Sequence, residues 1–260
     1  MLKLITAEFR KIKRKKLFQI AFLSTFVMPV FYTLLLKDAS LEDLMSVVQE
    51  ENGFLLLIPF SVVTAANLFF GEQDYDTLKN LLCIPVTKSR LAAAKLFVIL
   101  LFDIAYELAG YGVCIVLALF LGIPLENPGE QLFLTLCCGV LLWAAAMPCL
   151  LLVVWCNRSY IISVIIAFAY TVFGYVLHFS DAVLRVPLGI NIPTFLPVPL
   201  IFRWRYQFHS LENAGSVITE FYEEFRPYFV PTPAVFLILT AEAALCMALI
   251  IQIYRRDFTL

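Results

Sequence analysis

The sequence predicts an all-α integral membrane protein with six transmembrane helices, and three observations carry that prediction. The chain has 260 residues, of which 62% are hydrophobic and 15% charged, and its mean hydropathy is +0.88. Soluble domains are only about 45–50% apolar, so much of this apolar surface must face lipid. Six stretches are long enough to cross a bilayer, which takes about 20 apolar residues each. The segments between these stretches differ in charge, so they can be assigned to opposite sides of the membrane.

The predicted spans are bounded by charges, prolines or polar clusters. They are Leu17–Leu36, Phe54–Gly71, Leu91–Ile123, Gln131–Trp155, Tyr160–Phe179 and Ala234–Tyr254. The third is long enough to project beyond the bilayer. The first follows a basic run, as the apolar part of a signal peptide does, but it is too long and lacks a convincing cleavage site. We therefore expect it to be a retained helix.

The basic residues orient the chain. With the N-terminus inside, fourteen of the 19 Lys and Arg residues fall on or near the cytoplasmic side, so both termini are predicted to be cytoplasmic. They are Lys3, Arg10, Lys11, Lys13, Arg14, Lys15, Lys16, Lys79, Lys88, Arg90, Lys95, Arg158, Arg255 and Arg256. The opposite segments are acidic. Their carboxylates are Asp38, Glu42, Asp43, Glu50, Glu51, Glu126, Glu130, Asp181, Glu212, Glu220, Glu223 and Glu224.

Residues 1–16 are predicted to form an amphipathic helix on the inner membrane surface. Leu2, Ile5, Phe9 and Ile12 recur every three or four positions and so share one helical face, with Lys and Arg over the rest. A disordered basic tether is the alternative.

The segment 72–90 is the only substantial loop on the predicted cytoplasmic side. Asp74 can cap a short helix there, and Pro85 ends it. The apolar face of that helix consists of Tyr75, Leu78, Leu81 and Leu82, while Asp76, Lys79 and Asn80 face water. If the helix projects into water, its apolar face needs a docking partner. The alternative is a helix resting on the membrane surface.

The segment 180–233 is the largest one on the predicted outer side. Its four prolines between Pro187 and Pro199 break it too often for a seventh span, so short interfacial or re-entrant helices are expected. Four aromatic residues are predicted to lie at headgroup level. They are Trp204, Tyr206, Tyr222 and Tyr228. The two histidines, His178 and His209, are predicted to be interfacial polar residues.

Soluble-enzyme signatures are absent from the sequence: there is no G-x-x-x-x-G-K-[ST], H-E-x-x-H, G-x-S-x-G or C-x-x-C. No metal site is predicted, and no disulfide framework, because none of the seven cysteines lies in the long outer segments. Three carboxylates interrupt apolar spans, namely Asp103, Glu107 and Glu242. A charge within the bilayer is costly, so such residues serve conformational change or substrate binding, or act as hydrogen-bonded links between helices. Both interpretations stay open, and a cationic substrate would suit the first.

Two stretches resemble the permeases of ABC-2-type transporters. The stretch FFGEQDYDTLKNLLCIPVTKSRLAAAKL, Phe69–Leu96, is similar to the family's cytoplasmic loop, whose coupling helix docks into an ATPase subunit. The segment Glu8–Lys15, of pattern E-F-x-K-x-K-R-K, resembles the family's basic helix before the first span. Within the family, the small size and six bare helices look most like the immunity permeases for lantibiotics and bacitracin-like peptides. Exporters of sodium ions, lipids and polysaccharides have the same shape.

The resemblance implies an exporter in the bacterial plasma membrane. Its partners would be a separate ATPase subunit, which holds ATP and magnesium, and a second permease subunit, identical or different. This chain would hold no cofactor, bind no nucleic acid, and couple to the ATPase through Tyr75, Leu78, Lys79, Leu81 and Leu82. A membrane-embedded enzyme using Asp103, Glu107 and Glu242 as acid and base groups is one alternative, although the spans place no His near them. A membrane receptor or accessory subunit that does not transport is the other.

Overall fold

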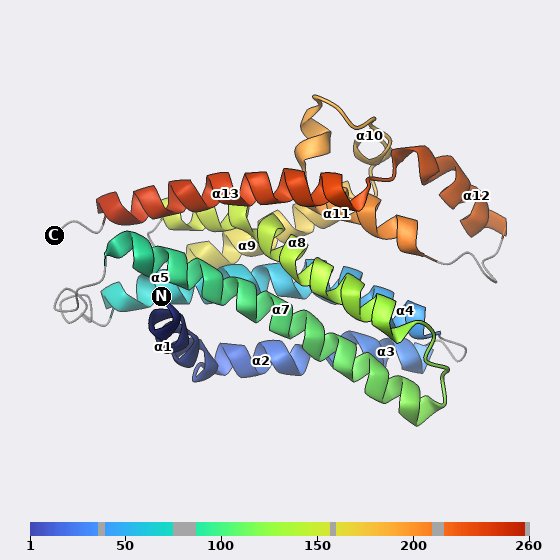
Figure 1. Ribbon diagram of the computed structural model, residues 1–260, viewed down its shortest axis with the longest axis horizontal. Helices are drawn as coiled ribbons and strands as arrows, with labels where there is room; N and C mark the ends of the chain where they lie inside the picture. The colour runs from blue at the N-terminus through green and yellow to red at the C-terminus, as the bar shows by residue number, and fades with distance from the viewer. Residues whose placement is uncertain (36–39, 75–86, 157–159, 210–215, 258–260) are drawn as a thin grey trace.

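The computed structural model describes residues 1–35, 40–74, 87–156, 160–209 and 216–257 of the chain. It is a bundle of helices that run roughly along one axis, with both termini towards the same end (Figure 1). We call this the terminal end and the opposite one the distal end. The described residues contain six helical segments long and apolar enough to cross a membrane, which confirms the predicted fold class.

A helix, α1 (Leu2–Lys13), precedes the first span. Most of its apolar face packs against the protein: Ile12 is buried in the main core, and Ile5 and Phe9 lie partly buried against it, while Leu2 is exposed. The neighbours include α7, the third span. The predicted helix therefore has protein rather than only membrane against its apolar face, while most of its basic residues are exposed.

The first span is interrupted, consisting of α2 (Lys16–Ser24) and α3 (Val27–Leu35). Pro29 accounts for the interruption, because proline has no N–H to donate to the carbonyl four residues earlier, that of Thr25. The freed carbonyl of Thr25 accepts a hydrogen bond from Asn52 Nδ2 of the second span at 3.4 Å. The break thus creates one of the polar contacts between the two spans.

The second span begins earlier than predicted. It comprises α4 (Leu41–Ser46), the π-helix η1 (Val47–Leu57) and α5 (Ile58–Asp74). Ser40 and Asp43 form a capping box that starts the helix. Glu50 and Glu51, predicted to lie in an outer loop, are therefore part of the span.

The remaining spans are α7 (Lys88–Leu121), α8 (Pro128–Cys156), α9 (Tyr160–Leu177) and α13 (Thr232–Asp257). Gly122, at φ +71°, ends α7 in the left-handed conformation that glycine favours. α8 contacts α13, α7, α5 and α9. In the second and fourth spans 78% of the most apolar window is buried, against 17% in the first and fifth. Spans two and four therefore form the core, and spans one and five lie mostly exposed on the outside of the bundle.

The segment between α9 and α13 contains short helices at the distal end (Figure 1). They are α10 (Asp181–Leu184), η2 (Ile192–Phe195), α11 (Pro197–Arg205), η3 (Tyr206–Phe208), α12 (Ser216–Phe225) and η4 (Arg226–Tyr228). Trp204, which was predicted to lie at headgroup level, is fully buried within the protein and donates to Thr232 Oγ1 at 3.0 Å. His178 is likewise buried and stacks on Phe202, with 3.8 Å between ring centroids.

Candidate functional site

The predicted ATPase-coupling residues lie outside the residues that the structure describes. They are Tyr75, Leu78, Lys79, Leu81 and Leu82. The helices on either side are described: α5 ends at Asp74 and α7 begins at Lys88. The two helices that flank the predicted coupling segment, α5 and α7, contact each other.

Asp103 and Glu107 are fully buried on one face of α7, as their four-residue spacing predicts. Ser61 of α5 donates its hydroxyl to Asp103 Oδ2 at 2.9 Å. Within the described residues, Asp103 Oδ1 and both carboxyl oxygens of Glu107 are buried without a hydrogen-bond partner. An ionised carboxylate in such a site is costly unless a cation accompanies it.

The π-helix passes close to Glu107. A Cβ atom added to Gly53 would lie 3.3 Å from Glu107 Oε1 and 2.7 Å from Leu142 Cδ1 of α8. A Cβ on Gly110 of α7 would lie 2.5 Å from Val48 Cγ1. The two glycines therefore let η1, α7 and α8 approach closely around the buried carboxyl. A π-helical turn inside an α-helix is often found at a functional site.

Glu242 is not part of this pair. It lies on α13 and is half-buried, while its neighbours on that helix include the exposed residues Leu237 and Leu245. The three predicted carboxylates thus separate into a buried pair on α7 and a single residue on the last span.

A second polar network was missed by the sequence analysis. Arg205 of α11 is 1% exposed and donates from Nε to Gln49 Oε1 at 2.7 Å and from Nη2 to Ser46 Oγ at 3.3 Å. Gln49 in turn donates to Thr135 Oγ1 of α8 at 3.0 Å. Two arginines inside the apolar run IFRWR, Arg203 being the other, were the available signal. Arg203 donates from Nε to the carbonyl of Tyr228 at 2.9 Å, and burial lowers its pKa.

Next to this network lies a cavity of about 390 Å³, which we call the acidic cavity. Its walls come from α3, α4 and η1, with His209 closing one side. The lining residues are Met28, Phe31, Tyr32, Asp43, Ser46, Val47, Glu50, Glu51 and His209. No group of three or more His, Cys, Asp or Glu side chains in the described part of the chain is arranged to hold a metal ion.

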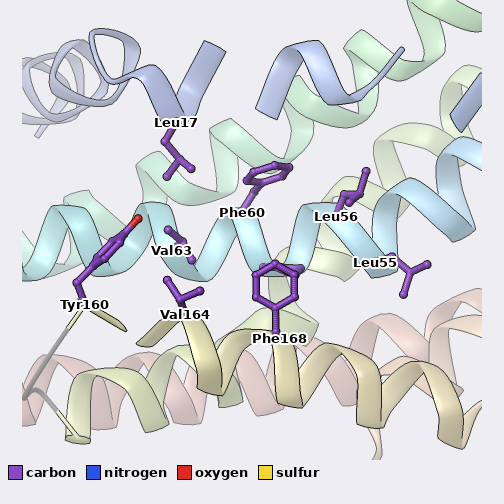
Figure 2. A pocket seen from close by; sticks show the side chains of 9 residues that line it. Leu17, Leu55, Leu56, Phe60, Val63, Tyr160, Val164 and Phe168 are labelled. Carbon is purple, nitrogen blue, oxygen red and sulfur yellow. The ribbon is translucent and has the colours of Figure 1, made fainter. Parts of the chain in front are cut away.

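A second cavity, of about 190 Å³, is lined almost entirely by apolar atoms, and we call it the apolar cavity. Figure 2 shows side chains of α2, of the second span and of α9 converging on it. The lining residues are Leu17, Leu55, Leu56, Pro59, Phe60, Val63, Tyr160, Val164 and Phe168. It lies between the two spans that are least buried, so its position is suited to an apolar group arriving from the lipid.

One comparison with known proteins identifies the family. The sequence model described as ABC-2 family transporter protein matches residues 4–174, which is more than half of the chain. The chain belongs to this family. No curated protein matches it.

The matched part of this ABC-2 family protein includes the first four spans, most of the fifth, the predicted coupling segment, Asp103 and Glu107. Membership makes the chain a multi-pass membrane component of a transporter and not itself an enzyme. It also implies an ABC ATPase as a partner.

A buried lysine of the ABC-2 family protein joins the helices beside the coupling segment. Lys95 of α7 is fully buried, and its Nζ donates to the carbonyl of Leu68 on α5. The same ammonium lies 5.4 Å from the ring centroid of Phe69 and 5.5 Å from that of Tyr254 on α13. The sequence predicted Lys95 only as a cytoplasmic-side charge, and the structure adds that it ties α5, α7 and α13 together.

Proposed function

We propose that the chain is the permease subunit of an ATP-binding-cassette exporter that removes a peptide antibiotic or another amphipathic substrate from the membrane. A separate ATPase subunit binds ATP and magnesium, and a second permease subunit, identical or different, completes the transporter. In this proposal the membrane is the bacterial plasma membrane, and both termini face the cytoplasm. Tyr75, Leu78, Lys79, Leu81 and Leu82 form the surface that receives the ATPase.

The observation that carries the proposal is the hydrogen bond from Ser61 to Asp103. It joins α5 to α7, and these two helices directly precede and directly follow the predicted coupling segment in the chain. Lys95 joins the same two helices nearer to that segment. Displacing the segment would move both helices as a pair and so act directly on the buried carboxyls.

The two cavities support an amphipathic substrate. The acidic cavity offers carboxylates, and the apolar cavity offers aliphatic and aromatic side chains. Both are bordered by the first span, which is little buried and so leaves them close to lipid. A molecule with one polar and one apolar part matches this pair of environments better than a wholly polar solute does.

The test is to solubilise the tagged chain gently from its native membrane and identify by mass spectrometry what co-purifies. The double substitution Leu78→Glu and Leu82→Glu reverses the apolar face of the predicted coupling helix. We expect the wild type to recover an ATPase subunit and the double variant to lose it and to lose transport, while both insert equally into the membrane.

A matched control changes the opposite face of the same helix, with Asp76→Gln and Asn80→Gln. This variant should keep the ATPase and full transport. Retention of the ATPase and of transport by the Leu78 and Leu82 variant would exclude the proposed coupling surface. Absence of any ATPase from the folded wild-type chain would exclude the exporter.

A further inference from the structure

We propose that the acidic cavity binds the ammonium or guanidinium group of a cationic amphiphile, whose apolar part extends into the apolar cavity. The inference deepens the proposed function and rests on it for its physiological meaning, because it names the charge of the exported substrate and the place where the substrate is held.

The shape and charge of the acidic cavity suit an organic cation. Its volume of about 390 Å³ is within the range of roughly 300–1,000 Å³ that is common for small-molecule sites. Asp43, Glu50 and Glu51 line it, and neither Lys nor Arg is among the lining residues. The cavity therefore favours a positive ligand group over a neutral or negative one.

Existing hydrogen bonds hold these carboxylates in place. Tyr175 of α9 donates its hydroxyl to Glu51, at 2.7 Å from Oε2, and His209 Nε2 lies 2.8 Å from Glu50 Oε1. Ser40 donates from its backbone N–H and its hydroxyl to Asp43. An ionised carboxylate has about four acceptor positions. Each carboxylate therefore keeps acceptor capacity for a ligand, while its orientation is already fixed.

The negative charge of Glu50 extends beyond the cavity wall. Burial raises the pKa of Tyr206, and the Glu50 carboxylate raises it further. Tyr222 behaves in the same way, although Arg205 opposes the shift there. Two groups outside the spans thus experience the negative charge of Glu50, as an incoming cation would.

The remaining walls fit the methylene or methyl groups around a cationic nitrogen. Phe31 and Tyr32 of α3 supply aromatic rings, and Met28 supplies a flexible thioether. Aromatic faces attract alkylammonium and guanidinium groups as well as apolar groups. Because Phe31 is 57% exposed, this wall is reachable from the lipid side of the first span.

The two cavities follow one another along the same pair of helices. Glu51 lines the acidic cavity, and Leu55, about one turn further along the second span, lines the apolar cavity. On α9, Tyr175 contacts Glu51 and Phe168 lines the apolar cavity. These two α9 residues are about 10 Å apart along the helix axis, a distance that a short alkyl chain bridges. A cationic head and its apolar tail can therefore occupy both cavities at once.

The experiment measures saturable binding of radiolabelled dodecyltrimethylammonium to the full-length chain in phosphatidylcholine nanodiscs, with empty nanodiscs subtracted. The double substitution Glu50→Gln and Glu51→Gln should weaken binding at least tenfold. The control, Glu126→Gln with Glu130→Gln, removes two exposed carboxylates from the same end of the bundle and should bind as the wild type does. Wild-type affinity in the Glu50 and Glu51 variant overturns the proposal.

A second variant keeps the test decisive if the Glu50 and Glu51 variant does not fold. Met28→Trp fills the acidic cavity from the lipid-facing span without changing a carboxylate, and it should also abolish saturable binding. Undiminished binding by a folded Met28→Trp protein, judged by its size-exclusion profile, overturns the proposal.

A competition experiment distinguishes a cationic amphiphile from a lipid headgroup, because both carry an ammonium group. Unlabelled dodecylguanidinium should displace the probe, whereas dodecylphosphocholine, which carries the ammonium beside a phosphate, should not. Equal displacement by dodecylphosphocholine overturns the assignment to a cationic amphiphile. It would show that the cavity binds a lipid headgroup. Binding is measured without an ATPase, so the Leu78 and Leu82 variant should bind normally. Failure of the exporter proposal therefore remains distinguishable from failure of this one.

Discussion

Arg205 Nε donates a 2.7 Å hydrogen bond to Gln49 Oε1, joining two residues that are 156 positions apart in the chain. The contact connects the short helix α11 to the π-helix of the second span. Because Gln49 also donates to Thr135, α8 is held by the same side chain. The segment after the fifth span is therefore tied into the core of the bundle.

Gln49→Met should lower the stability of the chain. Methionine has a similar volume but provides no acceptor for the buried Arg205, and leaving such a donor unpaired costs about 2–3 kcal/mol. Thermal unfolding in a mild detergent, followed by tryptophan fluorescence, should show a clearly lower midpoint. Gln19→Met is the control, because Gln19 is exposed on α2 and its midpoint should not move. Equal effects of the two substitutions would contradict a special role for the Arg205 contact.

Gly139→Ala should also destabilise the chain, because α7 and α8 are in close contact at this residue. An added Cβ would lie 3.0 Å from Ile104 Cα, a backbone atom that cannot turn away. Overpacking of this kind costs about 1–3 kcal/mol. Gly112→Ala is the matched control on α7, since a Cβ there meets nothing within 4 Å. It should be neutral or stabilising by about 0.5–1 kcal/mol, which is the usual gain of Ala over Gly in a helix. A similar midpoint for both variants would refute the close contact.

The positions of the spans were predictable because bilayer thickness imposes a minimum apolar length that composition reveals directly. The break-up of the segment before the last span was predictable for the same kind of local reason: its four closely spaced prolines, from Pro187 to Pro199, leave no room for an uninterrupted span, and α10, α11 and α12 are short helices. The buried face shared by Asp103 and Glu107 also followed from spacing alone.

What the sequence did not reveal depends on partners far away in the chain. From the local sequence alone, Glu50 and Glu51 suggest a loop. The span can include them because His209 contacts Glu50 and Tyr175 contacts Glu51. Arg205 likewise suggests an outer loop, and its burial is explained only by its hydrogen bond to Gln49, which is distant in the chain. A local pattern contains no signal for such pairs, so the start of the second span and the burial of α11 were missed.

Glu107→Leu should raise the stability of the chain while impairing transport. Both Glu107 carboxyl oxygens are buried without a hydrogen-bond partner among the described residues. An unpaired buried polar group destabilises a protein by about 1–3 kcal/mol, and an apolar side chain of similar size removes that cost. Asp103→Leu should raise the stability by less, because the Ser61 hydroxyl, which donates to Asp103 in the wild type, would lose its acceptor. Thermal midpoints and substrate export by the complete transporter would be measured side by side. A lower midpoint for Glu107→Leu would show that this carboxyl has a stabilising partner.

His178 should make the chain less stable at mildly acidic pH. Burial against Phe202 and Phe179 lowers its pKa, while the Tyr175 carbonyl and Glu50 oppose that shift. The folded chain therefore binds a proton on His178 less readily than the unfolded chain does, whose histidine has a pKa of about 6.5. By linkage, this contribution to stability is fully present above pH 6.5 and is lost as the pH falls towards the lowered value. The unfolding midpoint should therefore drop as the pH is lowered below about 6.5, and His178→Phe, which keeps the stacking, should flatten that drop. An unchanged drop in the His178→Phe variant would contradict the assignment to His178.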